Sequence, residues 1–145
     1  MTITSTLTTS FKQELLQGVH NFNKASSPDT FKLALYSSTA SLGASTTVFT
    51  TSGEVTGTNY TSGGATLTLK TGTPTTDGTT AVVDFDPLTF SNVTLTAAGA
   101  LIYNSSDSNK AVCVISFGQD ISASASDFTV TFPSTGASNS IIRLA

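Results

Sequence analysis

The second half of the chain is a series of short segments in which apolar and polar residues alternate at period two. Seven such segments are separated by residues typical of turns, and they run over 65–70, 80–86, 90–96, 98–104, 110–117, 128–132 and 140–144. Period-two alternation predicts β-strands. Strands this short and numerous predict a mainly β fold, an antiparallel β-sandwich or jelly-roll-like arrangement. Phe31–Tyr36 has the same pattern and adds an earlier strand.

Two of the expected strands differ from the others because nearly all of their residues are apolar. Ala100–Tyr103 and Ala111–Ile115 have no polar face. Such strands are typical of the centre of a sheet that is covered on both sides. The residues between them, 105–109, are expected to form a hairpin loop.

The expected strand over 80–86 turns Ala81, Val83 and Phe85 inward, which leaves Asp84 and Asp86 on the outward face. Two carboxylates two residues apart could bind Ca²⁺ or perform glycosidase chemistry. Residues 84–87 lack the further acidic or amide ligands of a calcium loop. The two aspartates are therefore interpreted as solvated charges at a strand end.

One segment near the N-terminus has a helical period. Its apolar residues recur at i, i+4, i+8 and i+11, at Phe11, Leu15, Val19 and Phe22. Ser10 followed by Gln13 fits a capping box. These features predict one short α-helix over about 11–23, with Gly18 inside it.

The chain divides into a short N-terminal segment and one domain. Residues 1–10 are expected to form an arm or peripheral strand, and residues 11–145 a single β-sandwich domain. The Ser/Thr/Gly-rich stretch from Ser37 to Gly64 is expected to be a structured loop. Its apolar anchors are Val48, Phe49, Val55 and Tyr60.

Charged residues are scarce, and this limits the chemistry available. They make up 10% of the 145 residues, with one His and one Cys, whereas 28 Thr and 21 Ser supply small hydroxyls. Acid–base and metal chemistry needs groups that change protonation or coordinate a cation. We assign no catalytic, cofactor-binding or metal-ligating residue and expect a protein that is not an enzyme. The lone Cys113 is interpreted as a buried, unreactive thiol.

The charge balance and hydropathy argue against two classes of partner. The net charge is -3, and the six basic residues are scattered, so no nucleic-acid partner is expected. No apolar run approaches about 18 residues, so no membrane partner is expected. No secretory signal is visible, and folding in a cytoplasm is expected.

Three stretches of the chain resemble a family of small proteins of tailed bacteriophages that are described as virion structural proteins. They are Phe11–Phe22, the run from Asp29 through Gly64 that ends in EVTGTNYTSGG, and Gly99–Val112. The resemblance covers most of the chain. It implies a virion component, by type a capsid cement or decoration protein, with no catalytic or ligand residue attached to any motif.

A cement protein spans neighbouring capsid subunits, so its contacts are expected on arms and loops. The expected partners are the major capsid protein or other virion proteins, and the chain is expected to form a homodimer or homotrimer. The expected location is the virion, assembled in the host cytoplasm. The candidate contact residues are Ile3, Leu7, Val48, Phe49, Val55, Tyr60, Ile142 and Leu144.

Two other functions remain open at this point. The chain could be a tail adaptor or fibre component of the virion, because Thr-rich strands and one short helix suit that function as well. It could also be a carbohydrate-binding β-sandwich module, which would need an exposed row of aromatic rings. The terminal segment 140–145 is expected to complete a sheet, because isolated termini seldom expose Ile and Leu.

Overall fold

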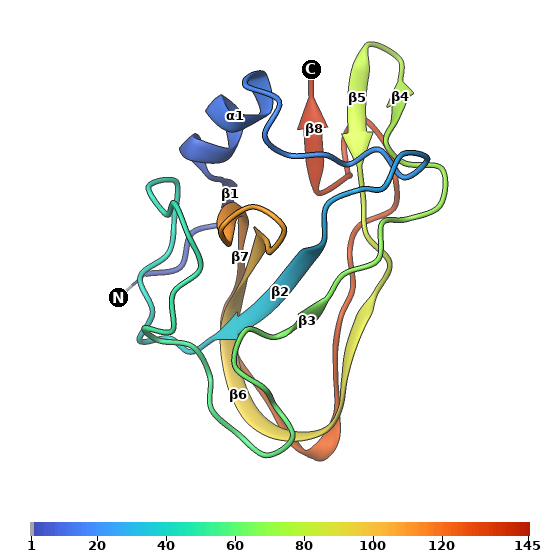
Figure 1. Cartoon of the computed structure of the whole chain (residues 1–145). Helices are drawn as coiled ribbons and strands as arrows, with labels where there is room; N and C mark the ends of the chain where they lie inside the picture. Colours follow the sequence, from blue (N-terminus) through green and yellow to red (C-terminus); the bar gives the residue numbers. More distant parts are fainter. Residues whose placement is uncertain (1) are drawn as a thin grey trace.

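Two long antiparallel strands form the frame of the computed structural model, which describes residues 2–145 (Figure 1). β6 (Leu88–Asn104) and β7 (Lys110–Val130) pair along most of their length and are joined by the turn at 105–109. The ribbon formed by these two strands bends at the bottom of Figure 1. In its register, Ala97 pairs with Ile121 and Gly99 with Ser116. The extra residues of β7 between these pairs form a bulge at Gly118, which has φ +77°.

The ribbon belongs to a five-stranded antiparallel sheet with the order β1-β7-β6-β2-β3. The other members are β1 (Thr6–Leu7), β2 (Phe31–Tyr36) and β3 (Ala65–Thr66). A second, three-stranded antiparallel sheet has the order β4-β5-β8. Its strands are β4 (Thr75–Asp77), β5 (Thr80–Val83) and β8 (Ile142–Leu144). The predicted mainly β fold with one short helix is confirmed, and the C-terminal segment completes a sheet, as expected.

The central strands are covered on both faces, as the lack of a polar face predicted. On one side, Leu33, Leu35 and Ile102 belong to the larger core cluster. On the other side, a smaller cluster forms around Tyr36, Leu101, Tyr103 and Val114, and Ile3 and Phe49 pack against it. The second face of the central strands is therefore covered by residues from the N-terminal segment and from the 37–64 loop.

The single α-helix is shorter than predicted. α1 spans Thr9–Leu16, with Thr8 as its N-cap; the Thr8 hydroxyl accepts a hydrogen bond from the Phe11 N–H. The predicted range of 11–23 and the Ser10 cap are wrong. Gly18 ends the helix instead of lying inside it: its φ is +73°, and the Val19 N–H donates to the Glu14 carbonyl. A glycine in this conformation is the usual residue just after a helix C-terminus.

The N-terminal segment lies against the domain and does not extend away from it. Thr6 and Leu7 pair with Val114 and Cys113, and the Thr4 N–H donates to the Leu42 carbonyl. The predicted arm is thus a peripheral strand, the alternative that the sequence left open. Within residues 2–145, no helix is long and apolar enough to cross a membrane.

Candidate interaction surfaces

The eight candidate contact residues do not form one surface. Val48 and Leu144 are 48% and 50% exposed. Val55 and Ile142 are buried, at 5% and 2%, so they are not available for contact in this conformation. The remaining four are partly buried and divide between the two clusters: Leu7 and Tyr60 pack on the larger one, Ile3 and Phe49 on the smaller one.

Glu54 organises the Gly-rich end of the long loop. One carboxylate oxygen accepts hydrogen bonds from the Tyr60 hydroxyl (2.9 Å) and the Gly63 N–H (2.6 Å), and the other accepts one from the Ser62 hydroxyl (2.7 Å). The Tyr60 hydroxyl in turn accepts one from the Leu35 N–H (2.9 Å), which ties the loop to β2. The predicted structured loop is therefore held by a carboxylate as well as by apolar anchors.

The three tyrosines point inward and do not form an exposed aromatic row. Tyr36 and Tyr103 are buried, and their hydroxyls donate to the carbonyls of Thr50 and Gly63. Burial raises the pKa of Tyr36, Tyr60 and Tyr103, and the negative charge of Glu54 raises it further. A carbohydrate site on tyrosine faces therefore has no support in this arrangement.

An apolar groove lies along β7 and the residues that follow it. This groove has a volume of about 510 Å³. Phe128 and Val130 are its buried side chains, Phe117 and Phe132 are partly buried, and Ile121 is 39% exposed. None of these residues was among the predicted contacts. The period-two pattern of Phe128, Val130 and Phe132 marks them as one strand face, but it cannot show that this face is left open.

A smaller apolar cleft is lined by residues of α1 and of the three-stranded sheet. Figure 1 shows these elements near one another at the top of the molecule. It measures about 190 Å³, and its aliphatic walls include Leu15, Val82 and Leu144. Leu16, the last residue of α1, is 92% exposed. The helical pattern alone could have predicted that Leu16 is exposed, because Leu16 lies outside the apolar stripe that contains Phe11 and Leu15.

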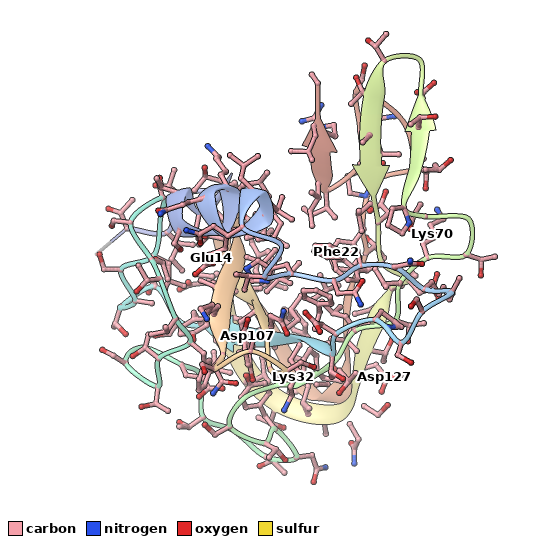
Figure 2. All side chains as sticks on the ribbon, turned by 45° about the horizontal axis from the view of Figure 1, so that its top comes forward. Glu14, Phe22, Lys32, Lys70, Asp107 and Asp127 are labelled. Atoms are coloured by element: carbon pink, nitrogen blue, oxygen red, sulfur yellow. The ribbon has the colours of Figure 1, made fainter. Side chains whose placement is uncertain are left out.

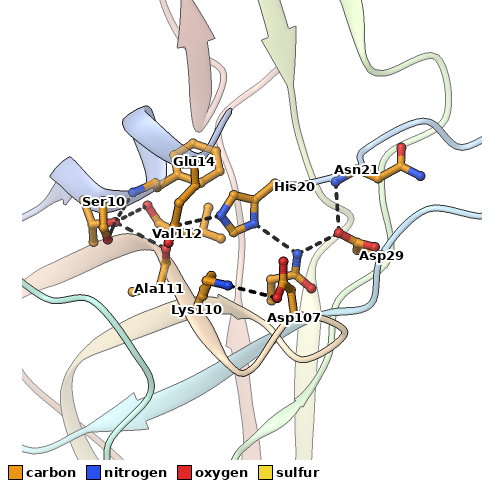
Figure 3. Close-up of polar contacts among 12 residues, drawn as sticks. Ser10, Glu14, His20, Asn21, Asp29, Asp107, Lys110, Ala111 and Val112 are labelled. Atoms are coloured by element: carbon orange, nitrogen blue, oxygen red, sulfur yellow. Dashed lines mark hydrogen bonds and ion pairs between the residues drawn. The ribbon is translucent and has the colours of Figure 1, made fainter. Parts of the chain in front are cut away.

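His20 lies in a buried polar network and not in a reactive site (Figure 3). The Asn104 amide group donates to His20 Nδ1 (3.0 Å) and to Asp29 Oδ2 (2.8 Å). Because Nδ1 accepts, Nε2 carries the proton and donates to Glu14 Oε1 at 3.0 Å. The imidazole is thus saturated by its partners, and it joins α1 to the end of β6.

The described part of the chain offers little for a metal or for nucleophilic chemistry. Residues 2–145 contain no group of three or more His, Cys, Asp or Glu side chains placed to hold a metal ion. Cys113 is buried in β7, and burial raises the pKa of its thiol to about 12. Charged side chains are spread over separate parts of the molecule, as Lys32, Lys70, Asp107 and Asp127 show in Figure 2.

Asp84 departs most from its predicted environment. The sequence placed it outward beside Asp86 as a solvated charge, but its side chain is fully buried. Val82, on the same expected outward face, is also buried, whereas Ala81, predicted to face inward, is exposed. Neither carboxylate oxygen of Asp84 has a hydrogen-bond partner among residues 2–145.

Replacing Asp84 with Asn is expected to raise the free energy of unfolding by about 1–3 kcal/mol, because an unpaired buried carboxylate opposes folding. Urea-induced unfolding measures the change. Asp86→Asn is the matched control: Asp86 is only partly buried, and a shift within about 0.5 kcal/mol is expected. A loss of stability in the Asp84→Asn variant would show that the carboxylate has a favourable partner and would contradict this prediction.

Comparison with known proteins finds no match for this chain among protein-family models, curated proteins or solved structures.

Proposed function

We propose that this chain is a non-enzymatic structural protein of a tailed-phage virion that binds the assembled capsid and stabilises it as a cement or decoration protein. The resemblance of residues 11–22, 29–64 and 99–112 supports a virion component. The partners are the major capsid protein or other virion proteins, and the protein acts as a homodimer or homotrimer on a symmetry axis.

The observation that carries this proposal is the apolar groove on β7. Phe128 and Val130, which line the groove, belong to the larger core cluster, so the groove lies where this cluster meets the surface of the β scaffold. A contiguous apolar opening on such a scaffold is typical of a protein-binding surface. Contact with many identical subunits requires a rigid scaffold with an open surface, and does not require reactive groups.

The test is the stability of phage heads prepared with and without this protein. Heads that lack it are expected to release their DNA at a lower temperature and after milder osmotic shock. Adding the purified protein back is expected to restore resistance. Equal resistance of the two preparations would show that the protein is not a cement.

Cryo-electron microscopy of the intact particle separates the head from the tail location. Density repeated over the shell and bridging capsid subunits is the expected result. Density confined to the portal vertex or the tail would support the tail adaptor or fibre function instead.

A further inference from the structure

β7 has a long unpaired edge. On its outer side, β1 pairs only with Cys113 and Val114, and the Ser116 N–H donates to the Ser5 hydroxyl. Beyond Ser116, the pairing of β7 is with β6 alone. A strand edge of this kind presents backbone N–H and C=O groups to which another strand can be added.

The apolar groove lies beside this edge. The register with β6 is regular from Phe128 to Val130, where these residues pair with Phe90 to Leu88. The groove is lined there by every residue from Asp127 to Pro133, together with Ile141 from the returning C-terminal segment; Phe128 and Val130 are the buried ones. The groove is therefore bordered by a short free edge of β7 that is regular over Phe128–Val130.

We propose that this edge and groove receive an extended segment of the partner, which adds to β7 over residues 127–130 and places every second side chain in the groove. This mode of recognition uses backbone hydrogen bonds for affinity and alternate side chains for specificity. The identity of the partner as a capsid protein rests on the function proposed above.

The charged residues of β7 indicate which side chains the added segment carries. Asp127 is the one charged side chain that lines the groove, and Asp120 lies on the same strand. One oxygen of Asp127 accepts a hydrogen bond from the Asn92 N–H (3.0 Å), and the side chain is exposed to a partner. Between residues 111 and 130, β7 has no basic residue. Asp120 and Asp127 make this part of β7 acidic, and a segment with Lys or Arg beside Asp127 is complementary to it.

The experiment measures binding of purified protein to phage heads assembled without it, by co-sedimentation. Ile121→Arg, which puts a large cation at the groove rim, is expected to weaken binding at least tenfold. Asp127→Asn retains an acceptor for the Asn92 N–H and removes the charge, and it is expected to weaken binding severalfold and to lessen its dependence on salt. Leu16→Arg is the control, since Leu16 is an exposed aliphatic residue (92%) that was not a predicted contact and does not line the groove. It is expected to bind like the wild type.

Circular dichroism and thermal unfolding establish that the variants are folded. Hydrogen exchange on the bound wild-type protein is expected to show new protection of amides within residues 127–130. Wild-type binding by the Ile121→Arg variant, or no new protection in β7, would overturn the groove proposal and leave capsid binding in place. A wild-type protein that does not bind heads would overturn both proposals.

Discussion

The Gly64→Ala variant is expected to lose about 4 kcal/mol or more of the free energy of unfolding, which is among the largest effects of one methyl group. Gly64 has φ +74°, a conformation that costs an alanine about 1–2 kcal/mol. A Cβ at this position would also overlap the Leu33 carbonyl oxygen and lie 2.6 Å from its carbon. The backbone of β2 cannot move away without breaking its pairing with β6.

Gly72→Ala separates the two contributions. Gly72 also has a positive φ, of +86°, but a Cβ there would meet no atom within 4 Å. It is expected to lose only about 1 kcal/mol, the conformational cost alone. Urea-induced unfolding of both variants measures the difference. If the two variants lost the same free energy, the close approach of Gly64 to β2 would be wrong.

The close approach of Gly64 to the backbone of β2 makes the end of the long loop part of the fold. Gly64 directly precedes β3. The loop segment before Gly64 is held by Glu54, whose carboxylate accepts hydrogen bonds from the Tyr60 hydroxyl and the Gly63 N–H. The sequence pattern predicted Val55 and Tyr60 both as apolar anchors of the loop and as partner contacts. Val55 is an anchor and is not accessible to a partner, because the loop that it anchors buries it.

The alternation of apolar and polar residues, together with turn residues, predicted the elements whose boundaries depend on neighbouring residues in the sequence. The strand at Phe31–Tyr36 and the hairpin at 105–109 were both found from alternation and turn residues. The helix was found as well, but its end was misplaced, because an isolated pattern does not show that Gly18 adopts φ +73°.

The misassigned features depend on distant parts of the chain. The sequence divided β6 near Ala97 and β7 after Phe117, where small and polar residues weaken the strand signal, but the two strands support each other through the bend. Asp84 was assigned to the solvent because alternation does not show what packs over a strand. The groove was missed for the same reason: whether a strand has a neighbour on its outer edge is a property of topology.

Raising the pH above about 10 is expected to destabilise the protein progressively through groups that the fold keeps neutral. Burial, followed by the charge of Glu54, raises the pKa of Tyr36 and Tyr60 above the ordinary value of 10.0. Burial raises the pKa of Cys113 from 9.0 to about 12. Below about pH 8 these groups are protonated in both states, so their contribution to stability is constant. At higher pH the unfolded chain loses these protons and the folded chain retains them, so stability falls as pH rises.

Each such group lowers the free energy of unfolding by up to about 1.4 kcal/mol per pH unit between its unfolded and folded pKa values. For Cys113 this window runs from about pH 9 to about pH 12, and the loss across it reaches about 4 kcal/mol. Added to the tyrosines, this approaches the whole stability of a typical domain. Urea-induced unfolding between pH 8 and pH 11 measures the slope, and the ultraviolet absorbance of phenolate reports tyrosine ionisation.

The Tyr36→Phe variant tests whether the slope comes from the buried phenols. It removes one ionisable group and one hydrogen bond to the Thr50 carbonyl. Its stability at neutral pH is therefore expected to be lower, but its loss of stability per pH unit above pH 10 is expected to be smaller than that of the wild type. Phenolate absorbance in the wild type is expected to rise together with unfolding. If it rose near pH 10 while the protein stayed folded, the tyrosines would be open to solvent, and the inward orientation that speaks against a carbohydrate site would be wrong.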